Sequence, residues 1–283
     1  MPPTTSAVSR FIASDEAVAA AQEFDRFLGQ IAPEYLDRFD PRVWQQVVDG
    51  GWLEIGTADD ESAFTLIDLA EFAEVWGARL VPGPFTTSVL ALSAAGAAES
   101  AAGIGHTYAL AGAAGLVPFG HVPGVVHLGG GPVADAAPDD FAPSLPVSPA
   151  GPDAGVSDAF VAQTLVLYGA ESIGAARACL EQTIPFTTMR EAYGQPLSSF
   201  QAVRHRLADM HKTIEAARSL LLLAVLDPAD ALGAVEIIAR DARTVIEGTI
   251  QVHGGMGFTW DMPMHRYLRH VMTIERILRS LRG

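Results

Sequence analysis

Two short stretches in the second half of the chain contain residues that could hold a phosphate-bearing ligand. REAYGQP places Arg190 one helical turn before a Gly-Gln-Pro break, and QVHGGMG places Gln251 close to Gly254 and Gly255. A guanidinium and the open backbone of helix ends suit a planar or pyrophosphate-bearing ligand. Glycines at helix ends also simply permit a left-handed backbone, and a lone Arg is also found solvated. The residues alone leave both interpretations open.

Composition excludes several classes of protein. The chain has 283 residues, of which 49% are hydrophobic, so it can bury a large core and is neither disordered nor fibrous. Its net charge of -15 would repel nucleic acid. The single cysteine, Cys179, rules out an internal disulfide and favours a reducing compartment. The longest apolar run, 220–226, is much shorter than the ~20 residues of a membrane span. We therefore expect a soluble cytoplasmic protein with neither a membrane nor a nucleic acid partner.

The elements that must position these motifs divide the chain into three predicted parts. No Lys or Arg lies between Arg79 and Arg177, and Gly and Pro concentrate in that interval. We predict an N-terminal helical domain over 1–102, a reduced β domain with a linker over 103–157, and a C-terminal bundle over 158–283. Apolar spacing and capping residues predict N-terminal helices at 16–28, 41–48 and 63–76, with a further helix after VPGP.

The middle part reads as a small β unit, and the last part as long helices. HTYALA, GLVPFG and VVHLGGG are short strand-like pieces, and 132–155 has the composition of a linker. The triplet 129–131 lacks the spacing of a phosphate loop, so we interpret it as a turn. Helices are expected at 160–188, 200–226, 229–253 and 264–281, which together form a four-helix bundle. The fold class is mainly α with a small β domain.

The two motifs resemble signatures of the acyl-CoA dehydrogenase family. R-E-A-Y-G-Q-P-x-x-x-F-Q followed by L-A-D-M is similar to the first signature, and Q-V-H-G-G-M-G-F-T-W is similar to the second. WQQVVDGGWLEIG and VWGARLVPGPF resemble the helical domain of that family. The resemblance implies an acyl-CoA dehydrogenase-like fold with an N-terminal helical domain, a central β domain and a C-terminal four-helix bundle.

The resemblance also implies which residues contact the cofactor, FAD. In the family, the matching positions reach across a dimer contact to the FAD of the neighbouring subunit. Here they are Arg190, Tyr193, Gln251, Val252, Gly254 and Gly255. Tyr193 stands where Phe is commoner. Phe200 and Gln201 are expected to hold the junction between two helices.

The family reaction needs a carboxylate base, and this chain departs from the pattern at both places where relatives carry one. The place in the first bundle helix is matched by Thr164, whose hydroxyl cannot act as a carboxylate. The other place is an E-G-T loop after the second motif, whereas here E-G-T occurs only at 247–249, before that motif. Glu171 and Glu275 are the nearest carboxylates in sequence, but their positions do not match either place, and Glu275 has an i+4 neighbour in Arg279. No catalytic residue is assigned.

The flavin site of the family's β domain is also missing from the sequence. No stretch resembling T-E-P-x-x-G-S-D occurs between Leu80 and Ser157. The chain thus resembles the non-catalytic partner in actinobacterial heterotetrameric acyl-CoA dehydrogenases of steroid side-chain degradation. That resemblance implies a related partner subunit that supplies the catalytic Glu, and a ring-bearing acyl-CoA substrate. The alternatives are a complete homo-oligomeric enzyme with an unrecognised base, and a non-enzymatic scaffold subunit. No metal site is expected.

Overall fold

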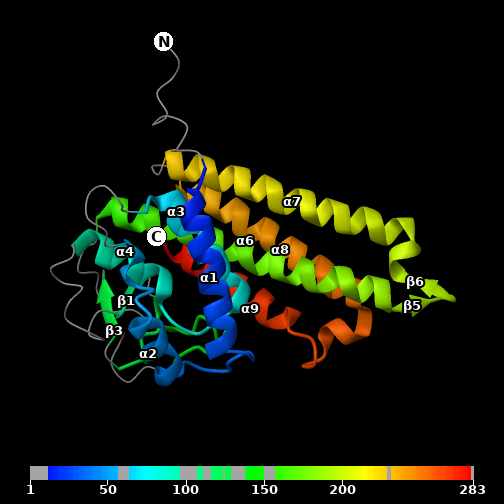
Figure 1. The fold of residues 1–283 in the computed structure, drawn as a ribbon, viewed down its shortest axis with the longest axis horizontal. Coiled ribbons are helices and arrows are strands. Elements are labelled where there is room, and N and C mark those ends of the chain that lie inside the picture. The colour runs from blue at the N-terminus through cyan, green and yellow to red at the C-terminus, as the bar shows by residue number, and fades with distance from the viewer. Residues whose placement is uncertain are drawn as a thin grey trace, which may run out of the picture.

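The structure is a computed structural model that describes residues 12–56, 64–95, 107–110, 116–123, 125–128, 138–149, 157–227 and 231–281. Most of these residues are helical, and the few strands are short. Helices α1 to α4 and strands β1 and β3 gather at one end of a bundle of long helices (Figure 1). The predicted fold class, mainly α with a small β part, is confirmed.

The first two N-terminal helices begin within one residue of the predicted positions, whereas the third begins at Leu66, three residues after its predicted start. Ser14 caps α1, Asp40 precedes Pro41 at the start of α2, and Thr65 forms a capping box with Asp68 at the start of α3. Trp76 and Phe24 lie at the centre of a buried aromatic cluster that joins these helices. The elements are α1 (Asp15–Ile31), α2 (Pro41–Asp49), the 3-10 turn η2 (Glu54–Gly56), α3 (Leu66–Arg79) and α4 (Phe85–Ala95).

The middle segment contains two separate pairs of strands. Strand β1 (Thr107–Leu110) pairs in parallel with β3 (Val125–Leu128), and β2 (Leu116–Pro118) pairs antiparallel with β4 (Val147–Pro149). The prediction of a linker over 132–155 is wrong at β4, because residues 147–149 form a strand there. Asp139 and Val147 also exchange two backbone hydrogen bonds. A three-residue strand is too short to show an alternating pattern in a Pro- and Ala-rich segment. The glycines at 129–131 lie outside the described residues.

The last part of the chain is a four-helix bundle, as the spacing of apolar residues predicted. The bundle helices are α6 (Asp158–Met189), α7 (Gln201–Leu226), α8 (Ala231–His253) and α9 (Met264–Ser280). A hairpin of β5 (Glu191–Ala192) and β6 (Gln195–Pro196), followed by the 3-10 turn η4 (Leu197–Ser199), connects α6 to α7. A second 3-10 turn, η6 (Gly254–Phe258), follows α8. The division of the chain into three domains at 102 and 157 stays a prediction.

Helices α3 and α6 cross with their backbones in direct contact. A Cβ atom added to Gly77 would overlap the carbonyl oxygen of Glu171, and one added to Gly174 would overlap the carbonyl oxygen of Glu74. The two contacts are reciprocal, because each glycine faces the helix that carries the other. This crossing fixes the N-terminal helices to the bundle, and so positions every residue that both parts share.

Helix α6 is long and apolar enough, by length and composition, to cross a membrane. Of its most apolar window, 78% is buried inside the protein, because α3, α7, α8 and α9 pack around it. The core helix of a soluble protein passes the same test, so the finding is weak as an indication of a membrane. Proline 185 lies inside the last turns of the helix.

Candidate functional site

The first motif forms a tight hairpin at the end of the bundle that lies furthest from β1 and β3 (Figure 1). Ala192 pairs with Gln195, so the turn contains only Tyr193 and Gly194. Both turn residues have positive φ, 53° and 78°, as in the two-residue turns that favour antiparallel hairpins. The left-handed backbone at Tyr193 costs about 1 kcal/mol, and it projects a tyrosine that is 98% exposed.

Arg190 ends α6 and begins this hairpin. Its backbone N–H donates to the carbonyl of Phe186, and its carbonyl accepts from Leu197. The backbone is thereby held at both sides, whereas the exposed guanidinium has no hydrogen bond or ion pair to any described residue. An unpaired guanidinium on a fixed backbone is suited to bind an anion.

The second motif lies at the same end of the bundle because the ends of α6 and α8 are joined. The ring of Phe186 stacks on that of His253, with ring centroids 4.1 Å apart. His253 is buried, and its Nδ1 lies 2.8 Å from the carbonyl oxygen of Thr249. Gln251, two residues before His253, is exposed, while Val252 is partly buried against the core. The structure thus brings together the two motifs that are separated by about sixty residues of sequence.

Two glycines after α8 leave open space around the backbone. Gly254 has φ of 60°, and a Cβ atom added at Gly254 or Gly255 would have no described atom within 4 Å. Gly257 differs, because an added Cβ would lie 2.6 Å from the carbonyl oxygen of Ile250. The first two glycines therefore keep the surface accessible, and the third permits close packing.

Large apolar side chains are exposed around these two motifs. They come from the end of α6, the hairpin turn, η6 and the turn after it. Their exposure contrasts with that of Trp44 and Trp76, which are buried. A surface that exposes several large apolar groups together is typical of an interface. The residues are Ile184, Met189, Tyr193, Met256, Phe258 and Trp260.

The carboxylates and the hydroxyl considered as a base all have partners within the protein. Thr164 is fully buried and donates to the carbonyl of Phe160. Glu171 is also buried, with Oε2 3.1 Å from Nε2 of His270, whose Nδ1 lies 2.9 Å from Oγ of Ser144. This buried chain of contacts joins α6 and α9 to the segment before β4. Sequence spacing gave no sign of it.

The remaining candidate carboxylates also have structural partners. Glu275 lies 3.4 Å from Arg279, which confirms the predicted i+4 pair, and 3.3 Å from Arg243. Glu247 pairs with Arg243 at 2.8 Å, and the E-G-T at 247–249 is inside α8, as expected. Among the described residues, no group of three or more His, Cys, Asp and Glu could hold a metal ion.

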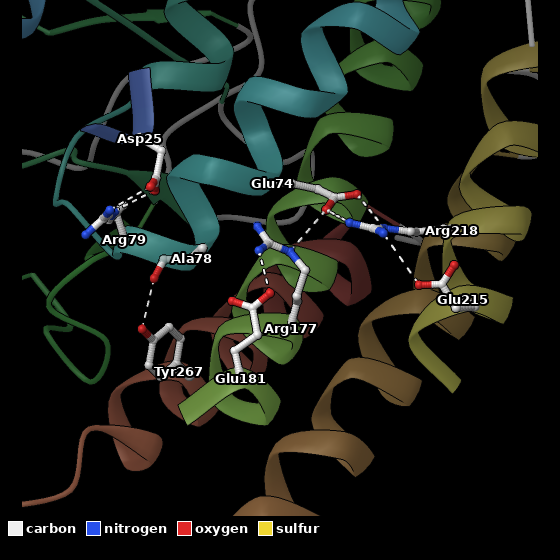
Figure 2. Close-up of polar contacts among 9 residues, drawn as sticks. All are labelled: Asp25, Glu74, Ala78, Arg79, Arg177, Glu181, Glu215, Arg218 and Tyr267. Atoms are coloured by element: carbon white, nitrogen blue, oxygen red, sulfur yellow. Dashed lines mark hydrogen bonds and ion pairs between the residues drawn. The ribbon is translucent and has the colours of Figure 1, made fainter. Parts of the chain in front are cut away.

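A polar cluster that the sequence did not reveal connects α3, α6 and α7 (Figure 2). Glu74, on the buried face of α3, accepts from Nε and Nη2 of Arg218 at 3.2 and 2.6 Å. Arg177 of α6 lies 3.7 Å from the same carboxylate and pairs with Glu181 at 3.0 Å. Two acids at i and i+3 in an apolar helix, Glu71 and Glu74, are the signal that could have located this cluster.

Replacing Glu74 with Gln should lower the free energy of unfolding by about 2 kcal/mol, because two guanidiniums lose their shared carboxylate. The value is set below that of a fully buried pair, since the side chain of Arg218 is 38% exposed. Urea denaturation monitored by circular dichroism would measure it. Glu215→Gln is the control, because that carboxylate is 52% exposed and lies 3.5 Å from Arg218. Equal losses in the two variants would contradict a special role for Glu74.

The profile of the family described as acyl-CoA dehydrogenase, C-terminal domain, matches residues 161–278. The match includes most of the four bundle helices and both motifs. Residues 161–278 form an acyl-CoA dehydrogenase C-terminal domain. The hairpin of Arg190 and the open glycines after α8 are therefore parts of that domain.

Curated relatives share this acyl-CoA dehydrogenase domain. The chain is 37% identical over 134 residues to acyl-CoA dehydrogenase IpdE2 of Mycobacterium tuberculosis, in a match covering 46% of this chain and 41% of that protein. It is 32% identical over 117 residues to a mitochondrial 2-methylacyl-CoA dehydrogenase of Solanum tuberosum, covering 39% and 28% of the two chains. These matches thus span less than half of the length of the curated relatives.

Solved structures extend the similarity of fold to nearly the whole chain. A chain in the ChsE4-ChsE5 complex from Mycobacterium tuberculosis superposes with a TM-score of 0.73 at 21% identity, covering 96% of this chain and 95% of that one. Butyryl-CoA dehydrogenase from Megasphaera elsdenii gives 0.67 at 14% identity, with 96% and 98% covered. At these identities the comparison shows the acyl-CoA dehydrogenase fold and nothing finer.

Proposed function

We propose that this chain is the subunit of a heteromeric, FAD-dependent acyl-CoA dehydrogenase that contacts FAD across a subunit interface and carries no catalytic base. The observation that carries the proposal is the unpaired Arg190 guanidinium at the same end of the bundle as the open backbone of Gly254 and Gly255. The two groups come from different helices, and the stacking of Phe186 on His253 holds those helix ends together.

The residues present fit the pyrophosphate and adenine parts of FAD. Arg190 offers a cation for the pyrophosphate, and Tyr193 an exposed aromatic ring. Gln251 offers an amide, while Gly254 and Gly255 let a planar group approach the backbone next to Val252. When bound, FAD would accept the hydride that leaves Cβ of an acyl thioester. The residues of this chain would bind and orient it.

The absence of a suitable base among the carboxylates considered supports a division of labour between two subunits. Removal of the proton α to the thioester carbonyl requires a carboxylate within hydrogen-bond reach of that proton. Glu171 bonds to His270, and Glu275 lies between Arg243 and Arg279. We therefore assign the base to a related partner subunit, in a heterotetramer.

The exposed apolar groups around the motifs support the partner. Met189, Phe258 and Trp260 are each at least 73% exposed in the single chain. A subunit contact there would remove them from water, which stabilises association by about 25 cal/mol per Å² of apolar surface. Similar folds occur in the ChsE4-ChsE5 complex and in the Tcur3481-Tcur3483 steroid ACAD. By the likeness to the steroid ACAD we propose a ring-bearing acyl-CoA as substrate. From the single cysteine we propose a cytoplasmic location.

The visible absorption spectrum of the purified chain should show no flavin bands when it is expressed alone. Co-expression with a related acyl-CoA dehydrogenase subunit should yield a complex with about one FAD per pair of unlike chains, because each site takes residues from both. The measurement is the flavin absorbance per mole of protein after gel filtration.

Two other outcomes would favour the alternatives. One FAD per chain without a partner would contradict the half-site function and favour a complete homo-oligomeric enzyme. A mixed complex whose flavin content is unaffected by removing Arg190 would favour a scaffold subunit.

A further inference from the structure

A hollow of about 920 Å³ lies between the N-terminal helices and the bundle, along the part of α6 from Arg177 to Pro185. Its walls come from α1, α3 and α6, with single residues from α7 and α9 and the segment 32–35 after α1. The volume suits an organic molecule of moderate size. None of the six residues assigned to FAD lines it.

The charges in this hollow are not fully paired. Each of the four arginines in its lining has an ion pair: Arg26 with Glu23, Arg79 with Asp25, Arg177 with Glu181 and Arg218 with Glu74. Two of the five lining carboxylates, Glu34 and Glu71, have no ion pair or hydrogen bond within the part of the chain that the structure describes. The uncompensated charge in the lining is therefore negative.

Glu71 is the more informative of the two carboxylates. Burial raises the pKa of Glu71 above its usual range, and the negative charge of the neighbouring Glu74 raises it further. The positive charges of Arg218 and Arg177 act in the opposite direction. A desolvated carboxylate without a direct partner is unfavourable in its charged form. A cation placed beside it would remove that penalty.

The second unpaired carboxylate, Glu34, is exposed and lines the hollow from the segment after α1. The hydroxyl of Tyr267 donates to the carbonyl of Ala78 and lies 2.8 Å from the hydroxyl of Tyr35, the residue after Glu34 (Figure 2 shows the Tyr267 contact). Ala78 is seven residues after Glu71 on α3, or about 10 Å along the helix axis. Between the ends, Val75 and Ala178 provide apolar wall.

We propose that this hollow binds a linear organic cation that carries ammonium groups at both ends, of the diamine or polyamine class. One ammonium group would pair with Glu71, and the other would lie near Glu34 and donate a hydrogen bond to the hydroxyl oxygen of Tyr35. The alkyl chain would lie along Val75 and Ala178. The density of paired charges in the walls argues against a steroid ring or a long acyl chain as occupant, because either would desolvate charges without bonding to them. The proposal does not depend on the function assigned to the Arg190 end.

Isothermal titration calorimetry of the full chain with spermidine at physiological salt would test the proposal. We expect saturable binding of one spermidine per chain. Glu71→Gln should weaken it at least ~10-fold, because the buried charge pair is lost. The matched control is Asp209→Asn, which removes one negative charge from an exposed position on α7, where the side chain is 76% exposed.

The control separates site binding from attraction to an acidic protein. Retained affinity in Asp209→Asn together with loss in Glu71→Gln supports the site. The proposal would be overturned if the unmodified chain showed no saturable heat of spermidine binding. It would also be overturned if both variants lost the same amount of affinity. Thermal melting of Glu71→Gln without ligand should be no lower than that of the unmodified chain, because the substitution removes an unfavourably buried charge. A lower melting temperature combined with lost binding would mean that the side chain serves folding rather than a ligand.

Discussion

Replacing Gly174 with alanine should lower the free energy of unfolding by at least ~3 kcal/mol. The added methyl group would overlap the carbonyl oxygen of Glu74 on α3, and backbone atoms of a helix cannot move aside as a flexible side chain can. The two helices would have to separate, which also disturbs the ion pairs of Glu74 with Arg218 and Arg177. Denaturant unfolding followed by circular dichroism measures the change.

Gly255→Ala is the matched control for this substitution. A Cβ atom at Gly255 meets no described atom within 4 Å, and this residue does not have the positive φ of Gly254. The expected change in stability is below about 0.5 kcal/mol. If alanine at Gly174 proved equally harmless, the close crossing of α3 and α6 would be wrong.

Replacing Arg190 with alanine should weaken FAD binding to the mixed complex ~10- to 100-fold. The reason is the loss of a charge-assisted contact, for which 1.5–3 kcal/mol is typical. The fold should be unaffected, because Arg190 holds the hairpin through its backbone N–H and carbonyl, which alanine retains. Flavin released on dilution, followed by fluorescence, measures the affinity.

Arg206→Ala is the control for charge. Arg206 is exposed on α7, where it has no ion pair or hydrogen bond to the described residues, so flavin affinity should be unchanged. An intact flavin content in Arg190→Ala would count against the FAD-contacting function. A loss of affinity in both variants would indicate a general effect of positive charge.

Local signals in the sequence were sufficient for most helices. Asp40 before Pro41 and Ser157 before Asp158 are capping residues, and the helices begin there in the structure. A capping interaction involves residues two or three apart, so a single stretch of sequence carries it. Strand β4 was missed because three residues are too few to establish a period.

Contacts between distant segments could not be predicted in this way. Gly77 and Gly174 are ordinary helix glycines in sequence, and only the crossing of α3 with α6 shows why a side chain would not fit. The same limit applies to Glu71 on α3 and Glu34 in the segment after α1, which line the same hollow. The two motifs were located through resemblance, but their convergence depends on the stack of Phe186 on His253. Their contact with FAD stays a prediction.

The burial of α6 on nearly all sides has a consequence for synthesis on the ribosome. Helix α3 emerges before α6, whereas α7, α8 and α9 emerge after it, so α6 is at first covered on one side only. A nascent chain of about 190 residues therefore presents a long, water-exposed apolar helix, which is the kind of segment that chaperones hold and that aggregates at high concentration. Slow translation just beyond the REAYGQP hairpin would prolong that exposure, while rapid completion of α7 and α8 would end it.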